Sequence, residues 1–142
     1  MFLDMGTITS ATAPPLQDLT IRYLMRALPA REYLGWFLYE QSAPETIIAG
    51  AGIFLRDIMP FPIMHGPLAG TVAVGKQGIV MNVYVDRAWR RRGLAHMLMQ
   101  HVLTFARAEG VESLVLHASR DGRPLYEQLG FAATNEMRLV PT

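Results

Sequence analysis

The chain contains no cysteine at any of its 142 positions. Disulfide bonds, thiolate-bound metals and a cysteine nucleophile are therefore all excluded. An excess of one charge is also lacking, because 13 lysines and arginines are balanced by 12 aspartates and glutamates, for a formal net charge of +1. A near-neutral chain offers no global attraction for nucleic acid, although local basic clusters remain possible.

Long hydrophobic runs are missing too, because charged residues and prolines interrupt every apolar stretch before it reaches the length of a membrane span. The N-terminus has neither the basic start nor the long apolar stretch of a signal peptide. We therefore expect a cytoplasmic protein with no membrane partner. The length fits one domain, residues 1–142, and the 51% of hydrophobic residues suffices for a core.

The first half of the chain predicts one helix and a pair of strands. Two prolines that suit a first helical turn precede apolar residues at helical spacing, so we expect a helix over residues 14–28. Residues 31–40 and 46–55 are rich in aromatic and β-branched side chains and predict two strands, with a turn at 42–45 between them. Residues 1–6 are interpreted as a fragment of helix.

Glycines and prolines interrupt the middle of the chain. Gly50 and Gly52, within the second strand, predict a bulge or the close approach of another backbone. Residues 56–77 contain several prolines and glycines and predict a long connection. Because this connection is unusually apolar, we expect it to form a substrate wall or a dimer contact.

The second half of the chain alternates strands and helices. The nearly continuous apolar run in residues 78–86 predicts a central strand buried on both faces, and a helix from Gly93 to Glu109 follows it. A strand at 114–118, a short helix at 123–129 and a last strand at 131–140 complete the chain. This order predicts an α/β layered fold in which helices cross over a sheet.

The turn after the central strand has the features of an anion-binding site. Three arginines, Arg90 to Arg92, precede Gly93. The first amides of a helix have no partner within it and carry partial positive charge, and a glycine lets an anion come close. Arginines add charge-assisted hydrogen bonds, so a phosphate or pyrophosphate is the expected ligand. The alternative is a solvated run of arginines followed by a glycine cap.

Two motifs in this half resemble those of the GNAT N-acetyltransferases. Residues 90–95, RRRGLA, resemble the signature Q/R-x-x-G-x-G/A, and residues 125–131, LYEQLGF, are close to L-Y-x-x-x-G-F. Both stand in the family's order, one strand apart, and the resemblance extends over residues 31–140. It implies the GNAT fold, a central mixed twisted sheet with helices on both faces. The N-terminal strand and most of the first helix of that fold are missing from this sequence.

The resemblance implies that the chain binds acetyl-coenzyme A as a co-substrate and needs no metal. The central strand would pair with the pantetheine arm, the helix start would hold the pyrophosphate, and Ser119 stands where many relatives have an asparagine near the pantetheine. The implied cofactor-binding residues are Val83, Tyr84, Val85, Arg90, Arg91, Arg92, Gly93, Leu94, Ala95, His96, Ser119 and Tyr126.

The implied reaction is direct attack of an amine on the thioester, and the absence of cysteine agrees with it. An amine with a pKa of about 10.4 must first lose a proton to a base. Tyr126 would stabilise or protonate the departing thiolate, with aromatic packing as its alternative role. His117 is a candidate base, or else a satisfied core histidine, and His65 is a further candidate. Glu136 would attract a cationic amine, or is a surface charge.

The missing strand leaves a sheet edge uncovered, which predicts a homodimer. Small amines, amino acids, antibiotics and protein N-termini all remain possible acceptors, because acceptor-side residues lie outside the two motifs. A second hypothesis is a non-catalytic coenzyme A-binding or sensor domain of the same fold. A third, a nucleic-acid module that uses Arg90–Arg92, is disfavoured by the near-neutral charge and the single short basic cluster.

Overall fold

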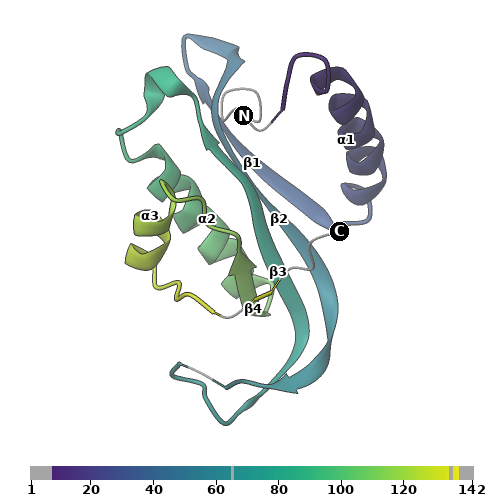
Figure 1. Cartoon of the computed structure of the whole chain (residues 1–142), viewed down its shortest axis with the longest axis vertical. Coiled ribbons are helices and arrows are strands. Elements are labelled where there is room, and N and C mark those ends of the chain that lie inside the picture. The colour runs from purple at the N-terminus through teal and green to yellow at the C-terminus, as the bar shows by residue number, and fades with distance from the viewer. Residues whose placement is uncertain (1–7, 65, 135, 138–142) are drawn as a thin grey trace.

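A four-stranded mixed sheet with helices on both faces forms the molecule (Figure 1). The structure, a computed structural model, describes residues 8–64, 66–134 and 136–137. Strands β1, β2 and β3 are antiparallel neighbours, and β4 is parallel to β3, which confirms the predicted α/β fold. The elements are α1 (Ala13–Ala27), β1 (Tyr33–Glu40), β2 (Ala43–Pro62), β3 (Val72–Val85), the 3-10 turn η1 (Arg87–Trp89), α2 (Leu94–Ala108), β4 (Val111–Leu116) and α3 (Arg123–Gln128).

The helices cover the two faces of the sheet unequally. Helix α1 lies on one face, and α2 and α3 lie on the other (Figure 1). Of the residues of α1 only Ala27 is buried, and the ring of Tyr23 meets that of Tyr33 edge-on with centroids 6.5 Å apart. Within the described residues, no helix is both long enough and apolar enough to cross a membrane.

The core lies between the sheet and α2. Trp36 of β1 stands edge-on to Phe105 of α2, with ring centroids 5.1 Å apart. Each fully buried aliphatic side chain contributes roughly 1.5–3 kcal/mol, so this interface holds α2 against the centre of the sheet. The buried core residues are Ala49, Ala51, Ile53, Leu55, Val80, Leu98, Met99, Val102 and Ala106.

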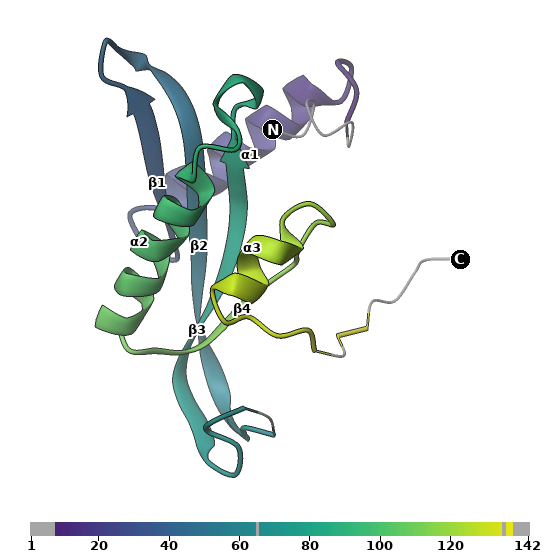
Figure 2. The ribbon, with the colours of Figure 1, turned by 90° about the vertical axis from the view of Figure 1, so that its left-hand side faces the viewer.

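The long connection predicted over residues 56–77 is wrong. Strand β2 continues to Pro62 and β3 begins at Val72, so most of this segment is a paired two-stranded arm that extends beyond the rest of the sheet (Figure 2). Pairing between β1 and β2 ends at Phe54. Beyond Phe54, the edge of β2 that faces away from β3 has no strand partner in the described chain. Pro60 lacks a backbone N–H, but on an edge without a partner no ladder hydrogen bond is lost.

The predicted strand pair is confirmed as β1 and β2, with one correction. Ala43 already pairs with Glu40, so the turn comprises Gln41–Ser42 rather than residues 42–45. Pro44 is accommodated because it lies close to the first residue of the strand, where a missing amide disturbs the ladder least.

The predicted last strand, residues 131–140, is not found in the part of it that the structure describes. The amide of Phe131 instead donates to the carbonyl of Tyr126 at 2.9 Å and completes the end of α3. The end of that segment lies outside the described residues, as does the predicted helix fragment at 1–6.

Candidate active site

Strands β3 and β4 separate at one end of the sheet. Their parallel pairing runs as far as Val80 opposite Leu116, and β3 then continues to Val85 paired only with β2. Residues 81–85 therefore have one backbone edge without a strand partner in the described chain. An extended ligand that carries amides can pair with such an edge.

An extra residue in β3 accompanies this separation. Gly50 pairs with Tyr84 and Gly52 pairs with Met81, so two steps along β2 match three steps along β3. Asn82, within the longer side, has a φ of 57°. Such a bulge bends its strand and increases its twist. The bulge predicted at Gly50 and Gly52 is confirmed at this position, but the extra residue lies on β3 and not on β2.

The turn after β3 presents backbone amides at the start of α2. Arg91 and Gly93 adopt left-handed φ values of 64° and 76°, and the space next to the Gly93 Cα is open. The first helical amide with a backbone acceptor is that of Met97, which donates to the carbonyl of Gly93 at 3.0 Å. The amides of residues 94–96 have no backbone acceptor in the described chain, which is the arrangement that binds anions.

The arginine side chains beside these amides are partly engaged along the turn. The Nε of Arg90 donates to the carbonyl of Val85 at 3.0 Å, and its guanidinium lies 5.8 Å from the ring centre of Tyr84. The guanidinium of Arg92 lies 4.8 Å from the ring centre of Trp89. These contacts engage the side chains of Arg90 and Arg92 within the turn itself.

Helix α3 and the turn before it place Tyr126 and Ser119 on Gly122. A Cβ on Gly122 would lie 3.0 Å from the Tyr126 ring and 3.1 Å from the Ser119 hydroxyl, so a larger residue there would require one of these side chains to shift. The Ser119 hydroxyl accepts a hydrogen bond from the Gly122 amide at 3.1 Å and shapes the start of α3. The Tyr126 ring is half-buried against Phe131, and burial raises the pKa of its hydroxyl above 10.0.

His117 lies immediately after the last residue of β4. Its Nε2 is 2.7 Å from Oε1 of Glu136, and the two side chains are 59% and 63% exposed. The interpretation of His117 as a satisfied core residue is therefore wrong, because its side chain faces solvent. Glu136 is more than an isolated surface charge, since it contacts the imidazole. His65 lies outside the described residues.

The fold thus gathers residues that are distant in the sequence at one end of the sheet. Because β3 and β4 are parallel, their carboxyl ends lie at the same edge, where clefts of α/β sheets bind ligands. The sequence motifs did not reveal Tyr33, whose hydroxyl accepts a hydrogen bond from Asn82 at 3.0 Å. The one available signal was an asparagine inside an apolar strand, since asparagine tolerates positive φ.

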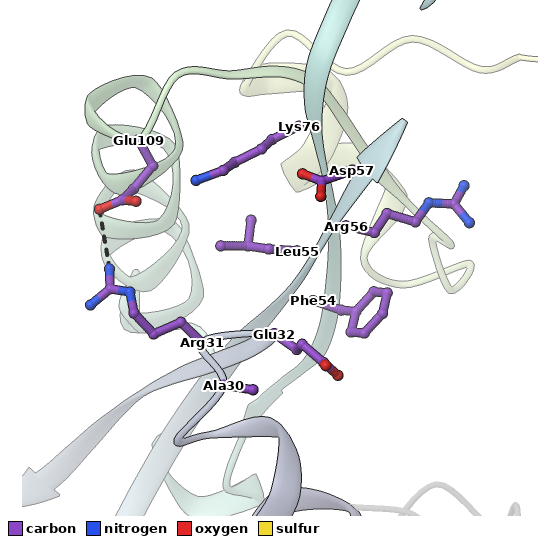
Figure 3. Close-up of a pocket in the computed structure, with 9 residues that line it drawn as sticks. All are labelled: Ala30, Arg31, Glu32, Phe54, Leu55, Arg56, Asp57, Lys76 and Glu109. Atoms are coloured by element: carbon purple, nitrogen blue, oxygen red, sulfur yellow. Dashed lines mark hydrogen bonds and ion pairs between the residues drawn. The ribbon is translucent and has the colours of Figure 1, made fainter. Parts of the chain in front are cut away.

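A cavity of about 460 Å³ lies elsewhere, near the start of the arm (Figure 3). Glu109, which follows the C-terminal end of α2, helps to line it and pairs with Arg31 at 3.2 Å. Gly93 precedes the other end of this helix, 16 positions from Glu109, which is about 24 Å at 1.5 Å per residue. The cavity therefore does not belong to the candidate site. Its lining residues are Ala30, Arg31, Glu32, Phe54, Leu55, Arg56, Asp57, Lys76 and Glu109.

Known proteins share this sequence pattern and this arrangement. The sequence model of the acetyltransferase (GNAT) domain matches residues 56–140, more than half of the chain. A glucosamine 6-phosphate N-acetyltransferase of Trypanosoma brucei brucei is 35% identical over 63 residues, which are 44% of this chain. Since the match covers 43% of that protein, it spans less than half of the relative's length.

Solved structures extend the likeness to nearly the whole chain. A GCN5-related N-acetyltransferase from Ralstonia eutropha superposes with a TM-score of 0.78 at 29% identity, over 99% of this chain and 85% of that one. A predicted acetyltransferase from Clostridium acetobutylicum, solved with acetyl-CoA, gives a TM-score of 0.66 at 27% identity, over 84% and 71%. The opening between β3 and β4, the amides at the start of α2 and these matches lead to one conclusion: the chain belongs to the GNAT acetyltransferase family.

Proposed function

We propose that this protein transfers the acetyl group of acetyl-coenzyme A to a primary amine of a small-molecule acceptor, by direct attack in a ternary complex. The observation that carries the proposal is the free edge of β3 next to the open amides of α2. A thioester cofactor needs both features, because its pantetheine arm carries amides and its pyrophosphate is an anion. The relative from T. brucei brucei, named for an amino sugar phosphate, favours the small-amine class.

The cofactor is assigned to the splayed end of the sheet. Its pantetheine amides pair with the backbone of residues 83–85, and its pyrophosphate binds the amides of 94–96. Arg91 and Gly93 turn the backbone so that these amides face outward, and their left-handed φ values support this role. Hydrogen bonds to a charged group contribute roughly 1.5–3 kcal/mol each, so a few such amides supply most of the affinity for the anion. Ser119 shapes the adjoining turn of α3.

The reaction exchanges the carbon–sulfur bond of the thioester for a carbon–nitrogen bond and moves a proton from nitrogen to sulfur overall. The amine nitrogen bonds to the thioester carbonyl carbon, the carbon–sulfur bond breaks, and the sulfur leaves with the electron pair. A proton from the Tyr126 hydroxyl neutralises the thiolate, and the tyrosine regains it from solvent. The protons that the amine loses pass to His117, directly or through water, and then to solvent.

Tyr126 suits the role of proton donor. Burial raises the pKa of its hydroxyl, so the group is protonated at neutral pH and has a proton to give. Because a thiol with an intrinsic pKa of about 8.5 is a stronger acid than a tyrosine, this transfer is uphill, and it is completed when solvent returns a proton to Tyr126. The ring is held against Phe131, so the hydroxyl keeps a constant position relative to β4 and α3.

His117 suits the role of base because Glu136 orients its ring. The carboxylate accepts a hydrogen bond from Nε2, which leaves Nδ1 as the nitrogen that takes the amine proton. Both residues lie beyond the end of the β3–β4 pairing, on the side where the thioester would emerge.

A binding and turnover experiment tests the proposal. Calorimetry with acetyl-coenzyme A should show one site per chain, and double-stranded DNA at the same concentration should give no signal. A panel of small amines, including glucosamine 6-phosphate, should release coenzyme A thiol only when an acceptor is present. Binding without thiol release from any amine would favour the sensor hypothesis, and absence of binding would reject the proposal.

We propose in addition that two copies of the chain associate through β1. This strand has one neighbour, β2, in the described sheet, and its sequence lacks the lysines and prolines that protect sheet edges. Phe37 and Tyr39 on it are 62% and 60% exposed. Light scattering should give twice the chain mass of 15.8 kDa, and Phe37→Lys should give the single mass. A wild-type protein of single mass would contradict this.

A further inference from the structure

The bulge that accompanies the separation of β3 from β4 depends on one residue in an unusual conformation. Asn82 has a φ of 57°, which glycine and asparagine adopt more readily than other residues. It stands two positions after Val80, the last residue of β3 that pairs with β4. The conformation of this single residue therefore coincides with the opening of the sheet.

Tyr33, on the edge strand β1, hydrogen-bonds to Asn82 across the intervening strand β2. The Nδ2 of Asn82 donates to the Tyr33 hydroxyl at 3.0 Å, although Tyr33 belongs to β1 and Asn82 to β3. The tyrosine reaches across β2 at Gly52, where a Cβ would overlap its hydroxyl and ring. Tyr33 is only 8% exposed, and its ring also meets Tyr23 of α1 edge-on. The contact thus spans three strands and is supported by a helix.

We propose that Tyr33 and Asn82 form a positioning pair that holds the bulge of β3, and with it the opening that receives acetyl-coenzyme A. This inference rests on the proposed function, since it assigns the opening to that cofactor. Neither side chain touches the cofactor in this arrangement. They act through the backbone of residues 83–85, whose free edge keeps its direction only while the bulge is maintained. Gly52 is required for the same contact, because any side chain at this position would displace Tyr33.

Three substitutions test the pair through cofactor affinity. Asn82→Ala removes the hydrogen bond and disfavours positive φ, so its Kd for acetyl-coenzyme A should rise about tenfold, equivalent to about 1.4 kcal/mol. Asn82→Asp also tolerates positive φ and accepts a hydrogen bond from the Tyr33 hydroxyl, so its Kd should stay within about threefold of wild type. Tyr33→Phe removes the hydroxyl alone and should give an intermediate value. The KM for the cofactor should follow Kd while kcat at saturation stays constant.

Gln77→Ala is the matched control. Gln77 lies on the same strand, where β3 still pairs with β4, and its side chain hydrogen-bonds to Ser113 at 3.1 Å and to Arg56 at 2.9 Å. Its loss should lower the melting temperature without changing the Kd. A wild-type Kd in Asn82→Ala, failure of Asn82→Asp to recover affinity, or an equal loss in Gln77→Ala would each overturn the positioning role.

Hydrogen exchange separates this inference from the proposed function. If the wild-type protein binds no acetyl-coenzyme A, the proposed function fails. The role of Tyr33 and Asn82 in holding the bulge is then tested by hydrogen exchange of the ligand-free protein. Asn82→Ala should then exchange the amides of residues 81–85 about tenfold faster than Gln77→Ala does, because the bulge loses its anchor. Equal exchange in the two variants would overturn the pair.

Discussion

At the scale of single residues, the Tyr126 hydroxyl is the group whose removal should separate chemistry from binding. Tyr126→Phe keeps the ring packed on Phe131 and removes only the proton donor. We expect kcat to fall about 100-fold, the lower end of what general acid–base groups contribute, with the Kd for acetyl-coenzyme A unchanged. Steady-state kinetics and calorimetry measure the two quantities, and an unchanged kcat would remove Tyr126 from the mechanism.

The pH dependence of stability gives a second test of the same residue. Burial raises the pKa of Tyr126, so the folded state holds this proton more tightly than the unfolded state does. The resulting stability is fully present below about pH 10 and is lost as the pH rises through the raised value. Urea unfolding from pH 9 to 11 should therefore show a steeper decline for wild type than for Tyr126→Phe.

Tyr39→Phe is the control for that comparison, because it also removes one tyrosine hydroxyl from the chain but leaves Tyr126 in place. Its stability curve should run parallel to that of the wild type, since both retain Tyr126. Parallel curves for wild type and Tyr126→Phe would contradict the burial of the hydroxyl.

His117 and Glu136 should act together in the pH–rate profile. His117→Ala should abolish the acidic limb of kcat, since a base that must be deprotonated is lost. Glu136→Gln keeps a hydrogen-bond acceptor next to the imidazole, so this variant should retain an acidic limb. The rate is measured by thiol release between pH 5 and 9. An unchanged limb in His117→Ala would exclude it as the base.

At the scale of elements, the two ends of α2 provide a matched pair of glycines. Gly93 precedes the helix with a φ of 76° and Gly110 follows it with a φ of 66°. Alanine at either position should cost about 1–2 kcal/mol of stability, because the left-handed conformation is unfavourable for a residue with a Cβ. Only Gly93→Ala should also weaken the binding of acetyl-coenzyme A, with a Kd that rises tenfold or more. Equal binding by both variants would remove the turn from the cofactor site.

The elements themselves were predictable where the signal is local. The helix after Gly93 and the central part of β3 follow from glycine, periodicity and a continuous apolar run, and both are confirmed. The sequence predicts a long connection over residues 56–77, because prolines disfavour strand pairing except on a strand edge that has no partner. That edge depends on where β1 stops, which is not a property of residues 56–77.

At the scale of the whole molecule, stability should be concentrated in the sheet–α2 interface rather than in the arm. Ile53 and Met59 lie on the same strand, β2, but are 0% and 86% exposed. Ile53→Ala should cost about 2–5 kcal/mol through a cavity, whereas Met59→Ala should stay within about 0.5 kcal/mol of wild type. Urea unfolding measures both. A large loss in Met59→Ala would mean that another surface covers the arm in solution.

Local chemistry was determined by the sequence. The proposed anion-binding turn at residues 90–95 needs only a glycine, a helix start and adjacent positive charge, and all of these lie within six consecutive positions of the sequence. The family motif at 125–131 is equally local, and it makes Tyr126 a candidate from the sequence alone.

Only the tertiary structure decided which distant residues meet near the candidate site. Asn82 meets Tyr33 49 positions away, and His117 meets Glu136 19 positions away. Neither contact follows from the pattern of either segment. The separation of β3 from β4 depends on the register between β2 and β3, where one extra residue changes the course of the strand. Register is a relation between distant segments, and it is set by packing on both faces of the sheet rather than by any short stretch of sequence.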